Sequence, residues 1–202
     1  TPEIPFAGAV VGGGDAFISE VDESDGSIAL FNPRIAVLNN ISLDHKSMEE
    51  LRSLFGDFVR KAEVAVLNLD NEEAKALAAG LRTPATYSLV DSSAQLFAHD
   101  LTPSLQGIDF QVTERATGAT ATVHLQVPGA HNVVNALAAV AVGLDLGVSF
   151  EQIQAGLQAF TGVDRRFQVR GEAGGVTVID DYGHHPAEIL ATLEALVRRA
   201  DG

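Results

Sequence analysis

Apolar residues along the chain follow two patterns, one typical of buried strands and one typical of amphipathic helices. Compact apolar runs occur at 35–38 and 64–67, and short continuous runs of this kind favour strands buried in a parallel sheet. A third strand is expected at 86–89. Between them, helical spacing predicts helices at 47–62 and 71–81. Because strand and helix alternate, this half of the chain is expected to form an α/β fold with a parallel sheet.

The pattern changes in residues 94–127, where three stretches of alternating apolar and polar positions are separated by turn residues. Such alternation predicts an antiparallel meander. We therefore expect a three-layer α/β domain, with a mainly parallel sheet flanked by helices and a small antiparallel sheet from residues 94–127. The remaining expected elements are helices at 132–146, 150–160 and 186–199 and one more buried strand at 176–179.

Charge and composition exclude several classes of function. The formal net charge is −14, and only 13 Lys and Arg are present to form a basic face, so binding to nucleic acid is not expected. The apolar runs are much shorter than a membrane span, and no basic-then-apolar signal is visible at the start. The chain has no cysteine, which excludes disulfides and thiolate metal sites. These features predict a cytoplasmic protein that does not bind membranes.

An acidic segment at 20–25 carries four carboxylates and begins at the end of the apolar stretch 16–21. Carboxylates this close are costly to place together unless a cation or solvent relieves their repulsion. For the segment alone, a solvated acidic turn is the better interpretation. We expect the stretch before it to be strand-like, which would place Glu20 at the end of a strand.

Asp44 and His45 follow the expected strand at 35–38, and open α/β sheets bind ligands at the carboxyl ends of their strands. An isolated Asp-His pair is more often a capping or surface feature. Glu20 and His45 together, however, could offer a carboxylate oxygen and an imidazole to one divalent ion.

Two later segments combine polar groups with a helix start. In 129–135, Asn132 and Asn135 lie three residues apart, on one helical face. An amide offers a donor and an acceptor, as the edge of adenine requires, although N-capping alone would also explain these residues. Arg165 and Arg166 suit phosphate oxygens. The ionisable run 180–186 lies between a buried strand and a helix, a position that favours function over a structural turn.

These segments resemble five motifs of the Mur ligase family, in the same order along the chain. The matching segments are Glu20-Val-Asp-Glu-Ser-Asp-Gly, Asn40-Ile-Ser-Leu-Asp44-His45, Gly129-Ala-His131-Asn132-Val-Val-Asn135-Ala136, Gly162-Val-Asp-Arg165-Arg166-Phe167 and Asp180-Asp181-Tyr182-Gly183-His184-His185-Pro186. Each motif is weak by itself, but five in register over nearly the whole chain are a specific signal.

The resemblance implies an ATP-dependent ligase that phosphorylates a carboxylate and then forms an amide from the acyl phosphate. The implied partners are UDP-N-acetylmuramate and an amino acid or short peptide. The resemblance implies that Glu20 and His45 hold Mg²⁺ and that Asn132 and Asn135 contact adenine. The implied role of Arg166 is to contact the nucleotide phosphates. Asp181, Tyr182 and His184 should lie where the central and C-terminal domains meet around the nucleotide. Glu20, His45 and Arg166 are thus the expected catalytic residues.

The chain also departs from the family pattern, since no Gly-Lys-Thr or Gly-Lys-Ser of a phosphate-binding loop occurs in it. We therefore interpret residues 1–183 as a central ATP-binding domain without that loop, and 184–202 as the start of a C-terminal domain. The motifs are most similar to those of members that add L-alanine to UDP-N-acetylmuramate. Two alternatives stay open, namely a peptidoglycan-recycling member that adds a tripeptide and a non-catalytic binding domain with the same fold.

Overall fold

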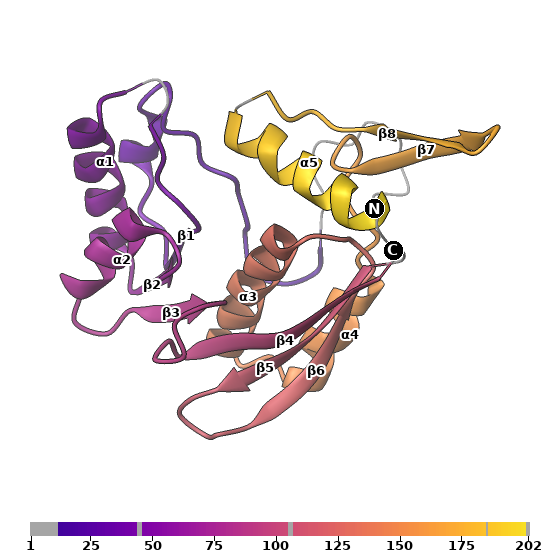
Figure 1. Cartoon of the computed structure of the whole chain (residues 1–202). Helices are drawn as coiled ribbons and strands as arrows, with labels where there is room; N and C mark the ends of the chain where they lie inside the picture. The colour runs from indigo at the N-terminus through magenta and orange to yellow at the C-terminus, as the bar shows by residue number, and fades with distance from the viewer. Residues whose placement is uncertain (1–11, 44–45, 105–106, 185, 201–202) are drawn as a thin grey trace.

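A six-stranded sheet forms the centre of the chain (Figure 1). The computed structural model describes residues 12–43, 46–104, 107–184 and 186–200. The strands lie in sequence order, and the first four pair in parallel while the last three pair antiparallel. Their bounds are β1 (Ile35–Leu38), β2 (Val64–Asn68), β3 (Ala85–Ser88), β4 (Leu96–Ser104), β5 (Gly107–Glu114) and β6 (Thr120–Leu125).

Helices cover both faces of this sheet, which confirms the expected three-layer architecture. On one face, α1 (Met48–Lys61), α2 (Glu72–Ala79) and the short 3-10 helix η1 (Ser27–Leu30) pack on β1 and β2. On the other face, α3 (Ala130–Asp145) packs on β2, β3 and β4, and α4 (Phe150–Ala159) packs on β6. The sheet thus separates two apolar cores.

The strand β2 shows how the sequence builds both cores at once. Ala65 and Leu67 belong to the core under α1 and α2, whereas Val66 belongs to the core under α3. Successive side chains of a strand point to opposite faces, so a strand covered on both sides is apolar at every position. This explains why the buried strands appear in the sequence as continuous runs.

Two helices begin with the capping boxes that the sequence predicts. Ser47 accepts a hydrogen bond from the Glu50 N–H, and the Glu50 carboxylate accepts one from the Ser47 N–H, at the start of α1. Ser149 and Gln152 form the same reciprocal pair at the start of α4. Each pair satisfies backbone donors that the first helical turn leaves free.

Three details differ from the sequence-based expectations. The meander does not form a separate sheet, because β4 pairs in parallel with β3 and extends the six-stranded sheet. Residues 16–21 form no strand, and Phe17 and Ile18 are exposed, so an apolar run alone was a misleading signal there. The strand at 176–179 is not buried. It belongs to a two-stranded antiparallel sheet of β7 (Gln168–Ala173) and β8 (Val176–Asp180) with exposed valines.

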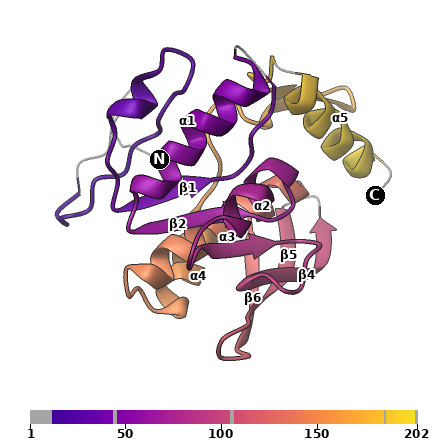
Figure 2. The same cartoon turned by 90° about the vertical axis from the view of Figure 1, so that its left-hand side faces the viewer.

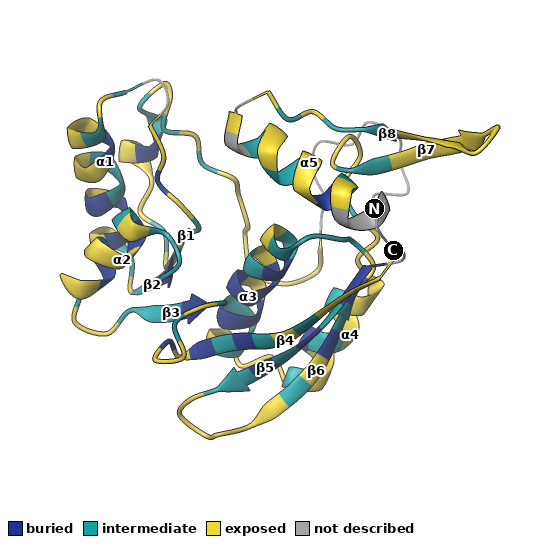
Figure 3. Cartoon of the chain, viewed as in Figure 1, coloured by how far each residue is buried: buried dark blue, intermediate teal, exposed yellow. Residues whose placement is uncertain are grey.

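The β7–β8 sheet and α5 (Pro186–Ala200) lie apart from the six-stranded sheet. Figure 2 shows α5 set to one side of the sheet and its covering helices. Figure 3 shows that β7, β8 and α5 are largely exposed, in contrast to α3 and the central strands. None of the described helices is long and apolar enough to cross a membrane. The described chain therefore consists of a sheet unit and a smaller unit of β7, β8 and α5.

Replacing Phe110 with alanine tests the core between the meander and α3. Phe110 is 1% exposed, and truncating a buried phenylalanine typically costs about 3–5 kcal/mol of unfolding free energy. We expect a loss of this size in urea unfolding. Val90→Ala is the matched control, because Val90 is 80% exposed and surface substitutions usually change stability by about 0.5 kcal/mol or less. Equal losses in the two variants would contradict this description of the core.

Candidate functional site

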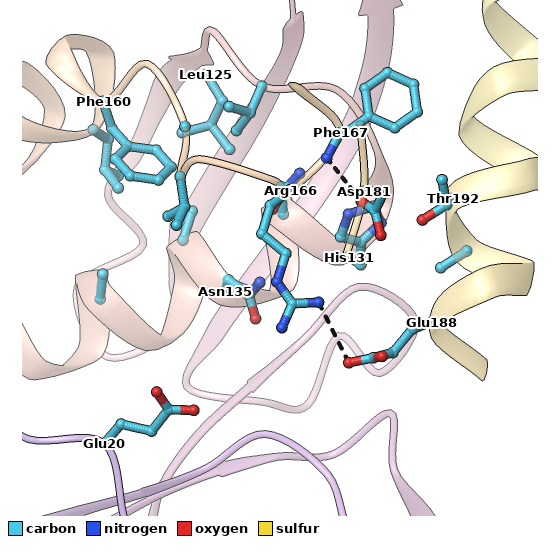
Figure 4. Close-up of a pocket in the computed structure, with 18 of the residues that line it drawn as sticks. Glu20, Leu125, His131, Asn135, Phe160, Arg166, Phe167, Asp181, Glu188 and Thr192 are labelled. Carbon is cyan, nitrogen blue, oxygen red and sulfur yellow. Dashed lines mark hydrogen bonds and ion pairs between the residues drawn. The ribbon is translucent and has the colours of Figure 1, made fainter. Parts of the chain in front are cut away.

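A cavity of about 930 Å³ lies between the sheet unit and the smaller unit of β7, β8 and α5 (Figure 4). Its walls come from the end of β6, the start of α3, α4, the segment before β7 and the first turns of α5. Five of the expected site residues line it: Glu20, Asn132, Asn135, Arg166 and Asp181. These residues are separated by up to 161 positions in the sequence, so the fold gathers them.

The first turns of α3 supply the two asparagines. Gly129 caps this helix with a φ of 101°, a conformation that favours glycine. A Cβ at this position would lie 2.6 Å from Cε1 of His131, so the glycine also makes room for the imidazole. His131 keeps an exposed edge, but the surrounding protein partly desolvates its ring and lowers the pKa of His131, although the charge of Asp181 opposes the shift. The imidazole therefore favours its neutral form beside Asn132.

The segment after β1 lies against the start of α3. The amide of Asn39 donates to Oδ1 of Asn135 over 2.9 Å. Asn71, the N-cap of α2, fixes this segment, because its side chain accepts from the Ile41 N–H over 3.2 Å and donates to the Ile41 carbonyl over 3.3 Å. The buried side chain of Ile41 adds an apolar anchor. Asn39 is thus held in place by groups on α2 and α3.

A fully buried tyrosine meets the same segment from β3. The hydroxyl of Tyr87 donates to Oδ1 of Asn39, and the tyrosine side chain is 0% exposed. Burial and the nearby charge of Asp70 raise the pKa of Tyr87. The hydroxyl therefore keeps its proton, and Tyr87, Asn39 and Asn135 form one continuous chain of hydrogen bonds.

The smaller unit contributes Arg166 and Asp181. Nη1 of Arg166 lies 3.4 Å from Oε1 of Glu188 on α5, as Figure 4 shows. The Asp181 carboxylate accepts from the N–H groups of Phe167 and Gly183, each over 2.7 Å. Burial acts to raise the pKa of Asp181, but these two N–H donors and the charge of Arg166 outweigh it and lower the pKa. Asp181 thus acts as a charged anchor for the loops around it.

Two expected residues lie beside the cavity and are not among those that line it. Tyr182 is exposed, and the guanidinium of Arg165 lies 4.7 Å from the centre of its ring. The rings of Tyr182 and His184 meet edge to face, with centroids 5.4 Å apart. Their predicted contacts with a nucleotide stay predictions.

Of the two predicted metal ligands, Glu20 and His45, the structure describes only Glu20. Glu20 is exposed and lines the cavity, but it lies in an irregular segment and not at the end of a strand. His45 falls outside the described residues. Within the described ranges, no three His, Asp or Glu side chains are close enough together to hold a metal ion. The pairing of Glu20 with His45 stays a prediction.

The cavity is acidic as well as polar. Glu20, Asp181 and Glu188 line it, and Arg166 is the only lysine or arginine among its described lining residues. An anionic ligand would therefore need further positive charge, since like charges at short range repel strongly in a partly buried site. A bound cation is one way to supply it.

Two family domains match the sequence. Residues 6–143 match the Mur ligase middle domain, and residues 165–202 match the Mur ligase glutamate ligase domain. The first match alone covers more than half of the chain. The chain belongs to the Mur ligase family. The division between residues 183 and 184 that the motifs suggested stays a prediction.

Two curated relatives in this family share one name. The UDP-N-acetylmuramate–L-alanine ligase of Desulfosudis oleivorans is 43% identical over 195 residues, and that of Geobacter sulfurreducens is 43% identical over 197. Each match covers 93% of this chain and 42% of the relative. This Mur ligase chain thus spans less than half the length of these curated relatives.

Solved structures of Mur ligases share the fold. The UDP-N-acetylmuramate–alanine ligase of Thermotoga maritima matches with a TM-score of 0.77 at 26% identity, over 90% of this chain and 42% of that one. The murein peptide ligase of Psychrobacter arcticus matches with a TM-score of 0.62 at 29% identity, over 85% of this chain and 36% of that one.

Sequence reasoning missed several residues that line this cavity or support those that do. Tyr87 lies in a segment that was predicted only to be a strand, yet a tyrosine buried in a strand needs a partner for its hydroxyl. That need was the available signal. Glu188 and Thr192 line the cavity from α5, and no pattern in the sequence separates them from ordinary helix-surface residues.

Replacing Asp181 with asparagine tests its role as an anchor. An amide can accept from only one of the two N–H groups and presents a donor to the other, so we expect a loss of about 1 kcal/mol near neutral pH. Because folding lowers the Asp181 pKa from 3.8, the wild-type advantage is complete above that value and is lost as the pH falls below it.

Thermal unfolding at a series of pH values would measure this advantage. Glu172→Gln, which removes one exposed carboxylate on β7, is the control for loss of charge. A difference between wild type and Asp181→Asn that persists unchanged in acid would contradict the carboxylate's role.

Proposed function

We propose that this chain is the ATP-binding part of a ligase that joins L-alanine to UDP-N-acetylmuramate in peptidoglycan precursor synthesis. The observation that carries the proposal is the cavity, which gathers residues of all five motifs. The curated relatives at 43% identity are named for this reaction. Because ATP is the energy source, we place the reaction in the cytoplasm.

In this proposal the nucleotide lies in the cavity with its base at the start of α3. Asn132 and Asn135 line the cavity with amide groups, which can pair with the edge of adenine. Arg166 would contact the phosphates, and its present partner Glu188 lies on a half-exposed surface. Asp181, Tyr182 and His184 would surround the nucleotide from the smaller unit.

Magnesium is the metal that the proposal implies, and the described residues suit it in part. Glu20 offers a carboxylate oxygen, the kind of ligand that Mg²⁺ prefers. Protein sites usually bind Mg²⁺ through one or two carboxylates, with water and substrate phosphates completing the shell, so three clustered protein ligands are not required. Glu20 and His45 would hold the ion, which would neutralise phosphate charge.

The chemical role of the protein residues is mainly positioning and charge neutralisation. The carboxylate of UDP-N-acetylmuramate attacks the γ-phosphorus of ATP, so that an acyl phosphate forms and ADP is released. The amine of L-alanine then attacks the acyl phosphate, so that an amide forms and phosphate leaves. Arg166 would stabilise the negative charge on the transferred group, as a preorganised cation does. Glu20 and His45 would fix the reacting groups relative to each other.

One observation favours a second candidate, a ligase that adds a tripeptide to the same nucleotide sugar. The murein peptide ligase structure is similar to this chain at 29% identity. Assays with L-alanine and with a tripeptide as alternative amines would separate the two candidates. A non-catalytic binding domain would show neither activity, although it would still bind the nucleotide.

Replacing Arg166 with alanine in the full-length protein tests the phosphate contact. Removing a group that stabilises transition-state charge typically lowers the rate about 100-fold or more, so we expect kcat/KM for ATP to fall by roughly that factor. Arg170→Ala is the matched control, because Arg170 is exposed on β7 and hydrogen bonds to Gln168. Equal effects of the two substitutions would contradict a role for Arg166 in catalysis.

The 202-residue chain by itself should bind Mg-ATP weakly and release no phosphate. It contains no Gly-Lys-Thr or Gly-Lys-Ser, so the backbone donors and lysine that surround a triphosphate in such loops are missing. Its net charge of −14 further disfavours an anion. Calorimetry and a phosphate-release assay with UDP-N-acetylmuramate and L-alanine would measure this. Micromolar affinity, or substrate-dependent phosphate release, would show that the phosphates bind elsewhere.

A further inference from the structure

The chain of hydrogen bonds from Tyr87 through Asn39 to Asn135, called the relay below, determines which atom of the Asn135 amide is left for a ligand. Nδ2 of Asn39 donates to Oδ1 of Asn135, so the oxygen of that amide is already engaged. Within the described part of the chain, Nδ2 of Asn135 has no hydrogen-bond partner, and Asn135 lines the cavity. Asn135 thus offers a ligand a donor.

The buried hydroxyl fixes this direction. If Asn39 turned its amide over, Nδ2 would face Tyr87 and the hydroxyl proton of Tyr87 would need another acceptor. The described residues place no other acceptor within hydrogen-bonding distance of that hydroxyl, and an unsatisfied buried donor is strongly unfavourable. Tyr87 therefore holds Asn39 in one orientation, and Asn39 does the same for Asn135.

Asn132 offers the complementary group. Its Nδ2 donates to the carbonyl of Pro128 over 2.7 Å, so the amide nitrogen is engaged locally. Its Oδ1 has no hydrogen-bond partner among the described residues, and Asn132 also lines the cavity. Three residues apart on one helical face, the two amides present an acceptor from Asn132 and a donor from Asn135.

This pair matches a base with an amine beside a ring nitrogen. Adenine has this arrangement, since its N6 amine donates and the neighbouring ring nitrogen accepts. A 6-oxopurine would place a carbonyl oxygen against Oδ1 of Asn132, and two acceptors repel. We propose that Tyr87 is a positioning residue for base recognition, because it fixes the Asn135 amide as the donor to the ring nitrogen. This inference rests on the proposed nucleotide site.

Nucleosides test the inference in the 202-residue chain, because they carry no phosphates and do not depend on a phosphate-binding loop. Adenosine is the reference probe. In 7-deazaadenosine and 1-deazaadenosine, one ring nitrogen next to the position of the amine is replaced by carbon. Purine riboside lacks the amine, and inosine has a carbonyl in its place. Titrations followed by NMR would give their dissociation constants. For wild type, we expect about fivefold weaker binding of a nucleoside that lacks the amine, or that lacks the ring nitrogen contacted by Asn135.

Tyr87→Phe removes only the hydroxyl, so Asn39 and Asn135 become free to turn over. The preference for adenosine over the deaza compound that lacks the nitrogen contacted by Asn135 should fall to about twofold or less. The preference for adenosine over purine riboside should persist, because Asn132 is unchanged. Ser88→Ala is the matched control. Ser88 is also buried on β3 and its hydroxyl bonds to Asp70, so its loss should lower stability without changing base selectivity.

Three other outcomes would overturn the inference in different ways. If Tyr87→Phe keeps the full preference for the ring nitrogen, the relay is wrong while the adenine site stands. If Ser88→Ala loses that preference equally, the effect of Tyr87 is general destabilisation. If wild type binds all five nucleosides equally, or none, the proposed adenine site fails together with the relay.

Discussion

Parallel pairing of β1, β2, β3 and β4 is the constraint on which the rest of the structure depends. The connections from β1 to β2 and from β2 to β3 each contain a helix, and such crossovers return on the same face when successive parallel strands are added in one direction. The helices α1 and α2 therefore cover one face. The opposite face stays open until the chain has completed the antiparallel strands, and α3 then covers it. This order of construction brings the start of α3 to the segment after β1.

That meeting point concentrates polar atoms where the two apolar cores end. Asn39 follows β1 and Asn135 lies on α3, and they hydrogen bond across 96 positions of sequence. Polar groups near a core are tolerated when each finds a partner, and no buried side-chain polar atom of the described residues lacks one. The same network leaves single amide atoms facing the cavity. The same hydrogen bonds therefore satisfy the polar groups near the cores and set which amide atoms face the cavity.

The sequence predicted the elements whose local signals agree with their burial, and failed where the two conflict. The capping boxes at Ser47 and Ser149 and the continuous apolar strands were sufficient for α1, α4 and the parallel sheet. Segments 16–21 and 176–179 also carry apolar residues, but Phe17, Ile18, Val176 and Val178 in them are exposed. Which apolar residues another element covers cannot be derived from a local pattern. The motifs singled out Asn132, Asn135, Arg166 and Asp181, which line the cavity, whereas Tyr87 became visible only through its hydrogen bond to Asn39.

The division into two units explains why the polar residues of the cavity come from both ends of the chain. The sheet unit brings amides, and the smaller unit brings Arg166, Asp181 and Glu188. The Arg166–Glu188 pair spans 3.4 Å, and both side chains are more than one-third exposed. Exposed ion pairs of this kind contribute little to stability, so exchanging Glu188 for a phosphate oxygen would cost the fold little. An arginine held this way is oriented towards the cavity before a ligand arrives, yet remains available to one.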